Sequence, residues 1–275
     1  MKFKYKKSSK KLFYPLLFVL LFLSILLSLG FYNTLQISNY NFTSSKVPAA
    51  FDGFKIVHIS DLHCATFGNN QQKLVNAIID YSPNLIVYTG DLIDDTHSDL
   101  SPVKTLLQSL DGVAPAFAVN GNHDTDNPNT YAELNSLFAT YHVTTLNDAS
   151  YTFTYNNQNI CLYGLDWHDW NASWVLPKAD TSKFNILLFH DTSLFDEIAP
   201  FNYDLVLTGH THGGIIRLPL IGGVLGNHNN LFPKYDSGAF TVGKSTMISS
   251  RGLGSSRIPR FFNDPELVFI TLHSK

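Results

Sequence analysis

Apolar runs alternate along this chain with polar breaks and helical stretches. Between Gln71 and Tyr81 the apolar side chains recur at the spacing of an amphipathic helix, and Pro83 follows where that helix would end. Two further helices are expected over Pro102–Leu110 and Thr130–Tyr141. Five short apolar runs predict strands, at residues 56–60, 85–89, 117–119, 186–189 and 205–208.

The second half of the chain is richer in strands. Tyr151–Tyr155 and Ile160–Tyr163 flank a polar segment over residues 156–159, which predicts a hairpin. The Gly-, Asn- and Pro-rich stretch from Gly222 to Asp236 predicts a long surface loop. Alternating helices and strands followed by more strands predict an α/β (α+β) fold, in which two sheets pack together with helices outside. Other strands are expected at residues 34–43, 215–218, 239–242, 245–248 and 267–272.

The N-terminal segment is apolar enough to interact with a membrane. Leu12 to Tyr32 is almost wholly apolar, and a helix of this length spans roughly 30 Å, the thickness of one hydrocarbon core. A cleaved signal peptide is the alternative, because Ser28 and Gly30 are small residues at suitable positions, but its apolar region is usually only about 7–15 residues long. An uncleaved anchor is therefore favoured, which divides the chain into a basic tail (1–11), a transmembrane anchor (12–32) and one large domain (34–275).

Charge is distributed unevenly along the chain. Six lysines and no acid occupy residues 1–11, and no basic residue follows until Lys46. This asymmetry predicts a single-pass protein with a cytoplasmic N-terminus, attracted to anionic lipid, and a large domain on the extracytoplasmic side. Of the 19 basic residues, six lie in this tail, which leaves 13 against 22 acidic residues beyond it. Such a surface repels polyanions, so no nucleic-acid partner is expected.

The chain has two cysteines, Cys64 and Cys161. Export would permit one disulfide between them, but two separate thiols are favoured because the chain has no cysteine-rich framework. Cys64 follows one of the polar clusters described next, so a contact with a metal is a further alternative.

Polar clusters follow the strand-like runs directly. Asp61 and His63 are two residues apart and project to the same side where an extended strand runs into a loop, and His210 and His212 have the same spacing. Asp91 follows a glycine that permits a sharp turn. Oxygen and imidazole ligands delivered from strand ends are what a two-metal hydrolase needs. The five clusters are Asp61-Leu62-His63, Gly90-Asp91, Gly121-Asn122-His123-Asp124, Phe189-His190-Asp191 and Gly209-His210-Thr211-His212.

Each cluster taken alone has an ordinary explanation. An isolated Asp-x-His is as often a hydrogen-bonded loop as a ligand pair, and Gly-Asp is mostly a turn. In the third cluster, Asp124 or the nearby Asn127 suits the cap of the following helix. All five in order are specific, and they predict a close pair of cations held by a bridging carboxylate, neutral imidazoles and an amide oxygen from Asn122.

The ordered series resembles the calcineurin-like metallophosphoesterase superfamily, whose pattern is D-x-H, G-D, G-N-H-D/E, H and G-H-x-H. The match covers roughly residues 50–275. The phrases His58–His63 and Gly209–Gly214 are similar to a compact, membrane-associated bacterial branch of that superfamily, and so is the segment from Ser250 to Glu266. The resemblance implies a four-layer αββα sandwich of the metallophosphoesterase type, preceded here by one transmembrane helix.

The resemblance also implies roles for individual residues. His123 would be the catalytic histidine near the leaving group, and Asp124 the acid that orients its imidazole. Ile215 stands where relatives often have Gln, which affects loop packing or substrate contact more than metal binding. One metal would be bound by Asp61, His63 and His212 and the other by Asn122, His190 and His210, with Asp91 bridging both.

The implied activity is hydrolysis of a phosphate ester, phosphodiester or pyrophosphate by a hydroxide that bridges two metal ions. Imidazole and carboxylate ligands suit Mn²⁺, Zn²⁺ or Fe. His123 as an imidazolium would stabilise or protonate the leaving oxygen. Tethering to a bilayer raises the effective concentration of membrane-borne targets, which favours a lipid-linked or envelope-derived substrate. A phosphorylated small molecule such as a nucleotide, or a phosphoprotein, is the alternative, because fold resemblance does not separate these substrates.

Residues outside the clusters are candidate substrate contacts. Arginines near the C-terminus suit a phosphate, although a solvated surface position is their ordinary role. Trp167, Trp170 and Trp174 have helical spacing, so they form either a stripe packed on the domain or an aromatic rim facing the bilayer or a lipid-linked substrate. The candidate substrate contacts are Arg251, Arg257, Arg260, His168 and His228.

Two other classes of protein suit this sequence less well than a phosphoesterase. A non-catalytic metal-binding scaffold with the same fold is disfavoured, because a degenerate copy should lose several ligands, whereas this chain retains the full set and His123. A metallohydrolase that cleaves an acyl or amide bond is disfavoured by the Gly-Asn-His-Asp cluster and by the absence of a His-Glu-x-x-His motif.

Overall fold

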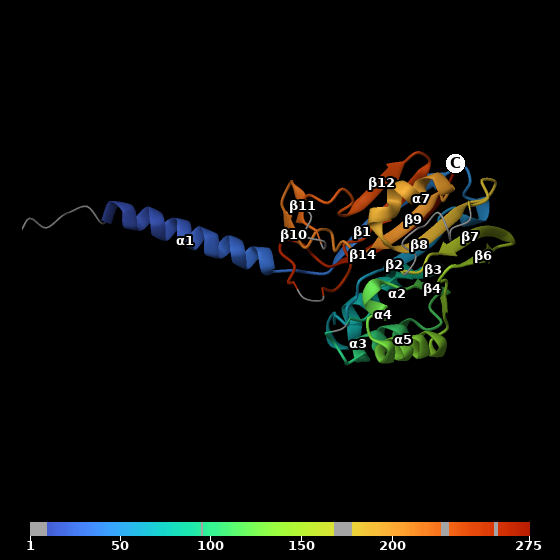
Figure 1. Cartoon of the computed structure of the whole chain (residues 1–275), viewed down its shortest axis with the longest axis horizontal. Coiled ribbons are helices and arrows are strands. Elements are labelled where there is room, and N and C mark those ends of the chain that lie inside the picture. The colour runs from blue at the N-terminus through green and yellow to red at the C-terminus, as the bar shows by residue number, and fades with distance from the viewer. Residues whose placement is uncertain (1–9, 95, 168–177, 227–230, 256–257) are drawn as a thin grey trace, which may run out of the picture.

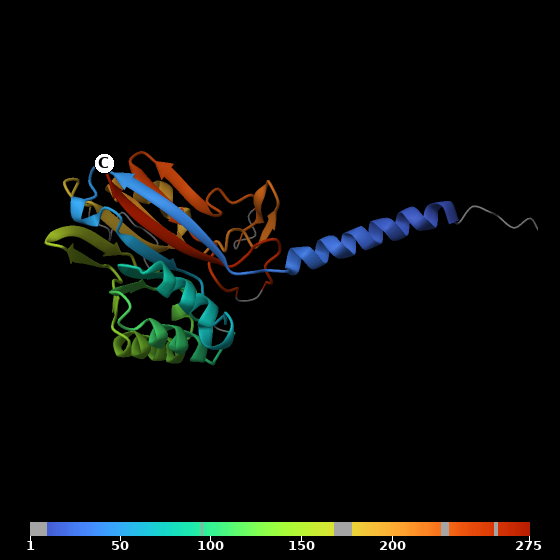
Figure 2. The same ribbon diagram turned by 180° about the vertical axis from the view of Figure 1, so that it is seen from behind.

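A long helix projects from a two-sheet body in the computed structural model, which describes residues 10–94, 96–167, 178–226, 231–255 and 258–275 (Figure 1). Helix α1 (Lys10–Phe31) stands away from the body when the molecule is seen from either side (Figure 2). Its stretch Phe13–Phe31 is long and apolar enough to cross a membrane. The predicted N-terminal apolar helix is therefore present; its insertion and orientation stay predictions.

The first sheet has six strands and supplies three of the polar clusters. β2, β3, β4 and β5 are mutually parallel, while β14 runs antiparallel to β2 and parallel to the edge strand β1. In spatial order the strands are β1 (Gln36–Ser44), β14 (Glu266–Ser274), β2 (Lys55–Ile59), β3 (Leu85–Thr89), β4 (Ala116–Val119) and β5 (Val143–Thr145).

The second sheet also has six strands, of which β7, β8, β9 and β13 are parallel. The predicted hairpin is present as β6 and β7, joined at Asn156 and Asn157, whose φ angles of 46° and 63° suit the tight turns that match strand twist. In spatial order the strands are β12 (Gly238–Val242), β13 (Ser245–Ser249), β9 (Leu205–Gly209), β8 (Asn185–Asp191), β7 (Gln158–Gly164) and β6 (Ala149–Tyr155).

Three buried layers hold the elements together. Side chains such as Val87 and Leu188 fill the space between the two sheets. Helices α2 (Gln72–Tyr81), α3 (Ser101–Leu110) and α5 (Pro128–Thr140) cover the outer face of the first sheet. The short helix α7 (Phe195–Ile198) and the 3₁₀ turns at 192–194 and 199–201 cover the second sheet. This arrangement is the four-layer αββα sandwich, and the predicted fold is confirmed.

The predicted surface loop from Gly222 to Asp236 is wrong in its first four residues. Gly222–Leu225 forms β11, which pairs antiparallel with β10 (Ile216–Leu218) in a separate two-stranded sheet. Glycine disfavours strands, but at this site a Cβ on Gly214 would lie 2.8 Å from the Cα of Gly223, so the close approach of two loops requires small residues.

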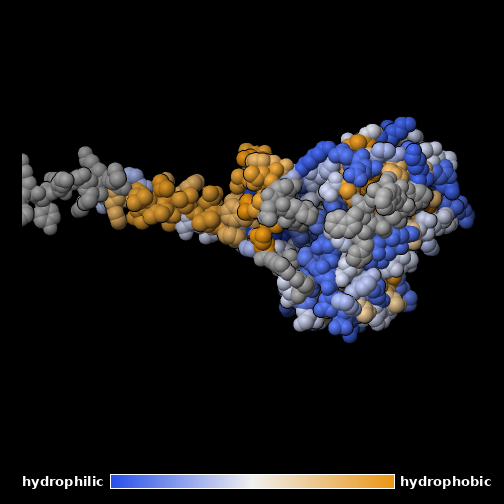
Figure 3. Space-filling view, viewed as in Figure 1, coloured by the Kyte–Doolittle hydropathy of each residue, from blue (hydrophilic) through white to orange (hydrophobic). Residues whose placement is uncertain are grey.

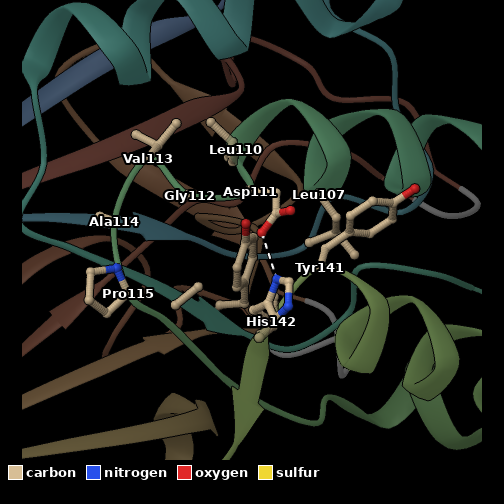
Figure 4. A pocket seen from close by; sticks show the side chains of 12 residues that line it. Leu107, Leu110, Asp111, Gly112, Val113, Ala114, Pro115, Tyr141 and His142 are labelled. Carbon is tan, nitrogen blue, oxygen red and sulfur yellow. Dashed lines mark hydrogen bonds and ion pairs between the residues drawn. The ribbon is translucent and has the colours of Figure 1, made fainter.

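A cavity of about 390 Å³ lies where β4 and β5 begin, at the edge of the first sheet opposite the polar clusters (Figure 4). Its one ion pair joins His142 Nδ1 to Asp111 Oδ1 at 3.0 Å, and both side chains are exposed. A largely apolar wall with one solvated pair offers no convergent polar groups for catalysis. The chemistry lies at the other edge.

Candidate metal centre

The polar clusters converge at one edge of the sandwich. Each begins at or just after the carboxyl end of a parallel strand, where ligands of open α/β sheets bind. Within each of two groups, the candidate metal-binding atoms all lie within 4.8 Å of one another, and every side chain is buried. The first group is Asp61, His63 and His212, and the second is Asp91, His190 and His210.

The first group is built by the loops after β2 and β9. His63 Nε2 lies 3.3 Å from His212 Nε2, and the two rings are stacked with centroids 5.0 Å apart. The same His212 nitrogen lies 3.6 Å from Asp61 Oδ1. Three ligand atoms therefore face one common point.

The second group is centred on His190. Its Nε2 lies 3.2 Å from His210 Nδ1 and 3.1 Å from Asp91 Oδ2. That carboxylate oxygen is also 3.8 Å from His63 Nε2 in the first group. Asp91 thus lies between the groups, at the position that a bridging ligand needs.

Asn122 is the seventh candidate ligand and opens the four-residue helix α4 (Asn122–Thr125) after β4. Its Oδ1 is buried and accepts no hydrogen bond from the part of the chain that the structure describes. A buried amide oxygen without a donor is costly unless a further group binds it. A cation would satisfy this oxygen, and the two groups supply the carboxylate and imidazole donors that fit two metal ions.

Five of the seven candidate ligands have a left-handed backbone. The φ angles lie between 46° and 70°, a region that residues other than glycine rarely adopt and that clusters at functional sites. Such torsions reverse the chain directly after a strand, which returns each side chain to the shared space. These ligands are Asp61, His63, Asp91, His210 and His212.

Gly90 lets two of the loops approach each other. Its φ is +87°, and a Cβ at this position would overlap the backbone of Gly121 and lie 2.7 Å from His190 Nδ1. A larger residue before Asp91 would therefore separate the loops that carry the second group.

Charges in the site are strongly coupled. Burial alone would raise the pKa of Asp91, but the neighbouring imidazoles of His190 and His63 outweigh it and hold that pKa well below its usual range. Burial alone would lower the pKa of His190, but Asp91 and Asp61 outweigh it and raise the pKa to about 10. A cation at the second group therefore competes with a proton for His190 Nε2.

His210 and His212, the two histidines after β9, favour the neutral form. Burial and the neighbouring His190 lower the pKa of His210 to about 4. Burial, His63 and Arg260 lower the pKa of His212 well below its ordinary value. Neutral imidazoles present a free lone pair, which is the form that binds a metal.

Outer contacts orient the ring nitrogens. His190 donates from Nδ1 to the carbonyl of Thr89 at 2.6 Å, which directs Nε2 into the site. His63 Nδ1 lies 3.4 Å from Asp94 Oδ2. The sequence interpretation did not include Asp94, although its place three residues after Asp91 in the same loop was a signal.

Arg260 stabilises the loop that carries His212 of the first group. It is buried, and it donates to the carbonyl of Gly254, the same oxygen that lies 3.3 Å from His212 Nδ1. Asn263 donates to the carbonyl of His212 at 2.6 Å. Arg260 was expected as a phosphate contact, but these bonds and its burial make it a support for the loop that carries His212.

His123 and Asp124 lie side by side in the chain but contact different groups. Asp124 is buried, and its carboxylate accepts backbone N–H bonds from Gly121 and from residues 91–93 at 2.8–3.2 Å. Burial and the charge of Asp91 raise the pKa of Asp124 to about 6. The prediction that Asp124 orients the His123 imidazole is wrong, because adjacent residues of a helix project in different directions.

Asp126 takes the orienting position instead. Its Oδ2 lies 2.8 Å from His123 Nδ1, as expected for residues three apart on a helical turn. The His123 ring packs edge-on against His63, with centroids 5.3 Å apart. His123 is partly exposed, so it lies at the mouth of the site.

The remaining candidates have mixed outcomes. The guanidinium of Arg251 contacts Gln36 Oε1 at 3.0 Å and Glu266 Oε1 at 3.4 Å, so its charge is paired with Glu266, while its side chain packs against Gly213 beside His212. Trp167 packs against the rings of His190 and His210 at centroid distances of 5.6 and 5.0 Å. The predictions for Arg257, His168, His228, Trp170 and Trp174 lie outside the described residues.

Both cysteines are free and buried, as the sequence favoured. Burial and nearby acids raise the pKa of Cys64 to about 12. A thiol that stays protonated is a poor metal ligand, so this argues against a contact between Cys64 and a metal.

Comparisons with known proteins agree with this geometry. Residues 54–214 match the family model for calcineurin-like phosphoesterases. The chain is 30% identical to the metallophosphoesterase YkuE of Bacillus subtilis over 87% of its own length and 86% of that protein. It is 29% identical to the phosphodiesterase YaeI of Escherichia coli, covering 80% and 82% of the two chains. It is 26% identical to the UDP-2,3-diacylglucosamine pyrophosphatase LpxG of Chlamydia muridarum, covering 86% and 88%.

Proposed function

This chain belongs to the calcineurin-like phosphoesterase family and is a metal-dependent hydrolase, and on that basis we propose that it cleaves a membrane-borne phosphate ester, phosphodiester or pyrophosphate at the paired groups described above. The observation that carries the proposal is the position of Asp91. One of its carboxylate oxygens lies within 4 Å of an imidazole nitrogen from each group, 3.1 Å from His190 and 3.8 Å from His63.

The proposed ligands divide between two ions. Asp61, His63 and His212 would hold the first, and Asn122, His190 and His210 the second, with Asp91 shared. Mn²⁺, Zn²⁺ and Fe suit this mixture of imidazole and carboxylate. When bound, the two ions would supply Lewis acidity toward the phosphoryl oxygens and would lower the pKa of a water held between them.

His123 is the proposed proton donor. Its ring is at the mouth of the site beside His63, and Asp126 accepts a hydrogen bond from Nδ1, which leaves Nε2 for the substrate. A protonated His123 would stabilise and then protonate the oxygen that leaves phosphorus. The backbone N–H of His123 donates to Asp91 Oδ1 at 2.8 Å, so the proton donor is fixed relative to the bridging carboxylate.

The proposed substrate class follows from the anchor. If α1 spans a bilayer, the domain meets membrane-borne phosphates at a raised effective concentration. Among its relatives, YaeI is named a phosphodiesterase and LpxG a pyrophosphatase of a diacylated sugar nucleotide. A phosphodiester bond and a pyrophosphate bond are therefore both candidate targets of this chain. A cavity of about 180 Å³ lined by His210, Thr211 and Tyr235 adjoins the second group and offers space for the non-reacting part of a substrate.

The test begins with full-length protein purified in detergent and stripped of metal. Reloading with Mn²⁺, Zn²⁺ or Fe²⁺ should restore two ions per chain by elemental analysis, together with hydrolysis of a chromogenic diester, a chromogenic monoester or a sugar-nucleotide pyrophosphate. Asp91→Asn should lose the second ion and most activity, while Ile79→Asn, on an exposed face of α2, serves as the matched control. Wild-type protein that binds two ions but hydrolyses no ester or pyrophosphate would instead be a metal-binding scaffold.

A further inference from the structure

Large apolar side chains gather around the β10–β11 hairpin, at the end of the body where α1 joins it (Figure 3). Each is at least 38% exposed, and Leu220 at the hairpin turn is fully exposed. Contiguous apolar patches on a protein surface mark contacts with proteins or membranes. The patch, which we call the hairpin patch, consists of Leu218, Leu220, Ile221, Leu231 and Phe232.

The hairpin patch is joined to the end of α1 through the segment around Phe261. The carbonyl of Gly30 accepts a hydrogen bond from the N–H of Phe262 at 2.7 Å, and the Phe31 and Phe261 rings pack with centroids 5.0 Å apart. A Cβ on Gly30 would overlap the Phe261 ring, so a glycine is needed for this approach.

The same segment continues into the hairpin. Phe261 forms a β-bridge with Ile216, and Arg217 donates its N–H to the Phe261 carbonyl at 3.0 Å. The end of α1 and β10 are thus two sides of one hydrogen-bonded unit. An element that positions α1 relative to a bilayer also positions the hairpin.

The hairpin is polar at its base and apolar at its turn. At the base, Asp236 accepts from Arg217 Nη1 at 2.9 Å and from the N–H of Gly223 at 2.8 Å. Residues 215–234 contain two cations, Arg217 and Lys234, and no acid, and both cations are paired with acids outside this range, Asp236 and Asp196. An apolar turn that has no acidic residue and lies next to the end of α1 suits a lipid interface better than a protein partner.

We propose that the hairpin patch inserts into the interfacial layer of the bilayer that α1 spans, so that lipid is its partner. The inference rests on the proposed membrane anchoring. It also narrows the substrate class, because β10 begins four residues after His212 and Asn263 and Arg260 tie that loop to the α1 junction. The first ligand group is then held at headgroup depth, where it reaches a phosphate whose acyl chains stay in the bilayer.

The first experiment measures insertion without measuring activity. Full-length Leu220→Cys and Asn157→Cys variants, in a background where Cys64 and Cys161 are replaced by Ala, carry an environment-sensitive fluorophore and are reconstituted into phosphatidylcholine–phosphatidylglycerol vesicles. Asn157, at the β6–β7 turn on the far side of the body, is the matched control (Figure 1). We expect lipids brominated near the headgroup to quench the fluorophore at 220 about threefold or more and to leave the one at 157 unchanged.

Two outcomes would overturn the insertion. One is a fluorophore at 220 that aqueous iodide quenches as strongly as the one at 157. The other is a fluorophore at 220 shielded from both quenchers, which would assign the hairpin patch to a second copy of the chain.

The second experiment tests the substrate class. A Leu220→Asp/Phe232→Asp variant should lose about tenfold in activity on a phosphate diester embedded in vesicles and keep full activity on a water-soluble diester. Ile79→Asp, an exposed apolar position on α2, is the control and should change neither activity. If the double variant, relative to the wild type, lost the same fraction of its activity on both substrates, the proposal that the site meets its substrate at headgroup depth would be refuted. Absence of metal-dependent hydrolysis in the wild type would refute the proposed function, and the quenching result would stand independently.

Discussion

His123 Nδ1 and Asp126 Oδ2 are 2.8 Å apart, whereas the carboxylate of Asp124, which directly follows His123 in the chain, faces the backbone of residues 91–93. Neighbouring acids on one short turn therefore have different tasks. One supports the imidazole at the mouth of the site, and the other holds together the two loops that carry Asp91 and Asn122.

Removing the imidazole of His123 should slow the reaction without emptying the site. We expect His123→Ala to lower kcat by about 10²–10⁴, the usual contribution of a positioned acid, with two metal ions retained. The loss should be larger for an alkyl leaving group than for p-nitrophenol, because a poor leaving group depends more on protonation. Equal losses for both leaving groups, or loss of metal by elemental analysis, would contradict the role.

Removing the charge of Asp126 should have a smaller effect of the same kind. Asp126→Asn still occupies the position but no longer stabilises a protonated His123, so we expect kcat to fall by about tenfold with KM unchanged. The double variant with His123→Ala should be no slower than His123→Ala alone, since Asp126 acts through that ring. Additive losses in this double-mutant cycle would show that Asp126 acts elsewhere.

Asp124→Ala should destabilise the fold rather than change the chemistry. Four backbone N–H groups would lose their buried acceptor, and we expect the free energy of unfolding to fall by about 3 kcal/mol or more. Urea denaturation of the metal-free protein measures this. The control is Asp126→Ala, an exposed position expected to cost below about 0.5 kcal/mol. Similar values for the two variants would refute the distinction.

Asp94→Asn should weaken metal binding. Asp94 supports His63 from the side opposite the proposed metal, at 3.4 Å from Nδ1, and loss of such an outer partner typically lowers metal affinity by about 10–100-fold. Competition with a fluorescent chelator would give the affinity of each variant. The matched control is Asp99→Asn, an exposed acid of the following loop, which should bind metal as the wild type does.

Acid should destabilise the protein partly through His58. Burial lowers the pKa of this histidine to about 4 in the folded chain, where its Nε2 pairs with Thr89 Oγ1 at 2.7 Å. The unfolded chain binds this proton below a pKa of about 6.5, so stability is full above that pH and falls as pH drops toward 4. We expect about 3 kcal/mol of lost stability over this range. His58→Gln should have lower stability at pH 7 and a flatter dependence on pH; an unchanged slope would contradict the assignment.

The fold and the ligand convergence follow from local patterns. Asp61 and Asp91 each lie two positions after the last residue of a buried strand, and parallel strands end at the same edge of a sheet. The positions of the strand ends, and the convergence of the ligands there, could therefore be predicted from the sequence. Glycine-rich β11 could not, because its pairing depends on contact with the loop after His212 rather than on its own side chains.

The supporting contacts were harder to predict for a related reason. Arg260 reaches the His212 loop from 48 residues away in the chain, so no local spacing indicates the contact. Asp126 was within reach of prediction, because residues three apart on a helix share a face, but the four residues of α4 are too few to show helical periodicity. Family resemblance favoured Asp124 by position alone, whereas the direction of its side chain depends on the turn.

The left-handed ligand backbones make the metals part of the architecture. Each such torsion costs about 1 kcal/mol or more, so the five together amount to a sizeable fraction of the net stability of an ordinary domain, about 5–15 kcal/mol. Without ions, the unfavourable backbone conformations at this rim of the sandwich are offset by its hydrogen bonds. Bound cations would stabilise these conformations, so loss of metal would destabilise the ligand loops before the rest of the domain.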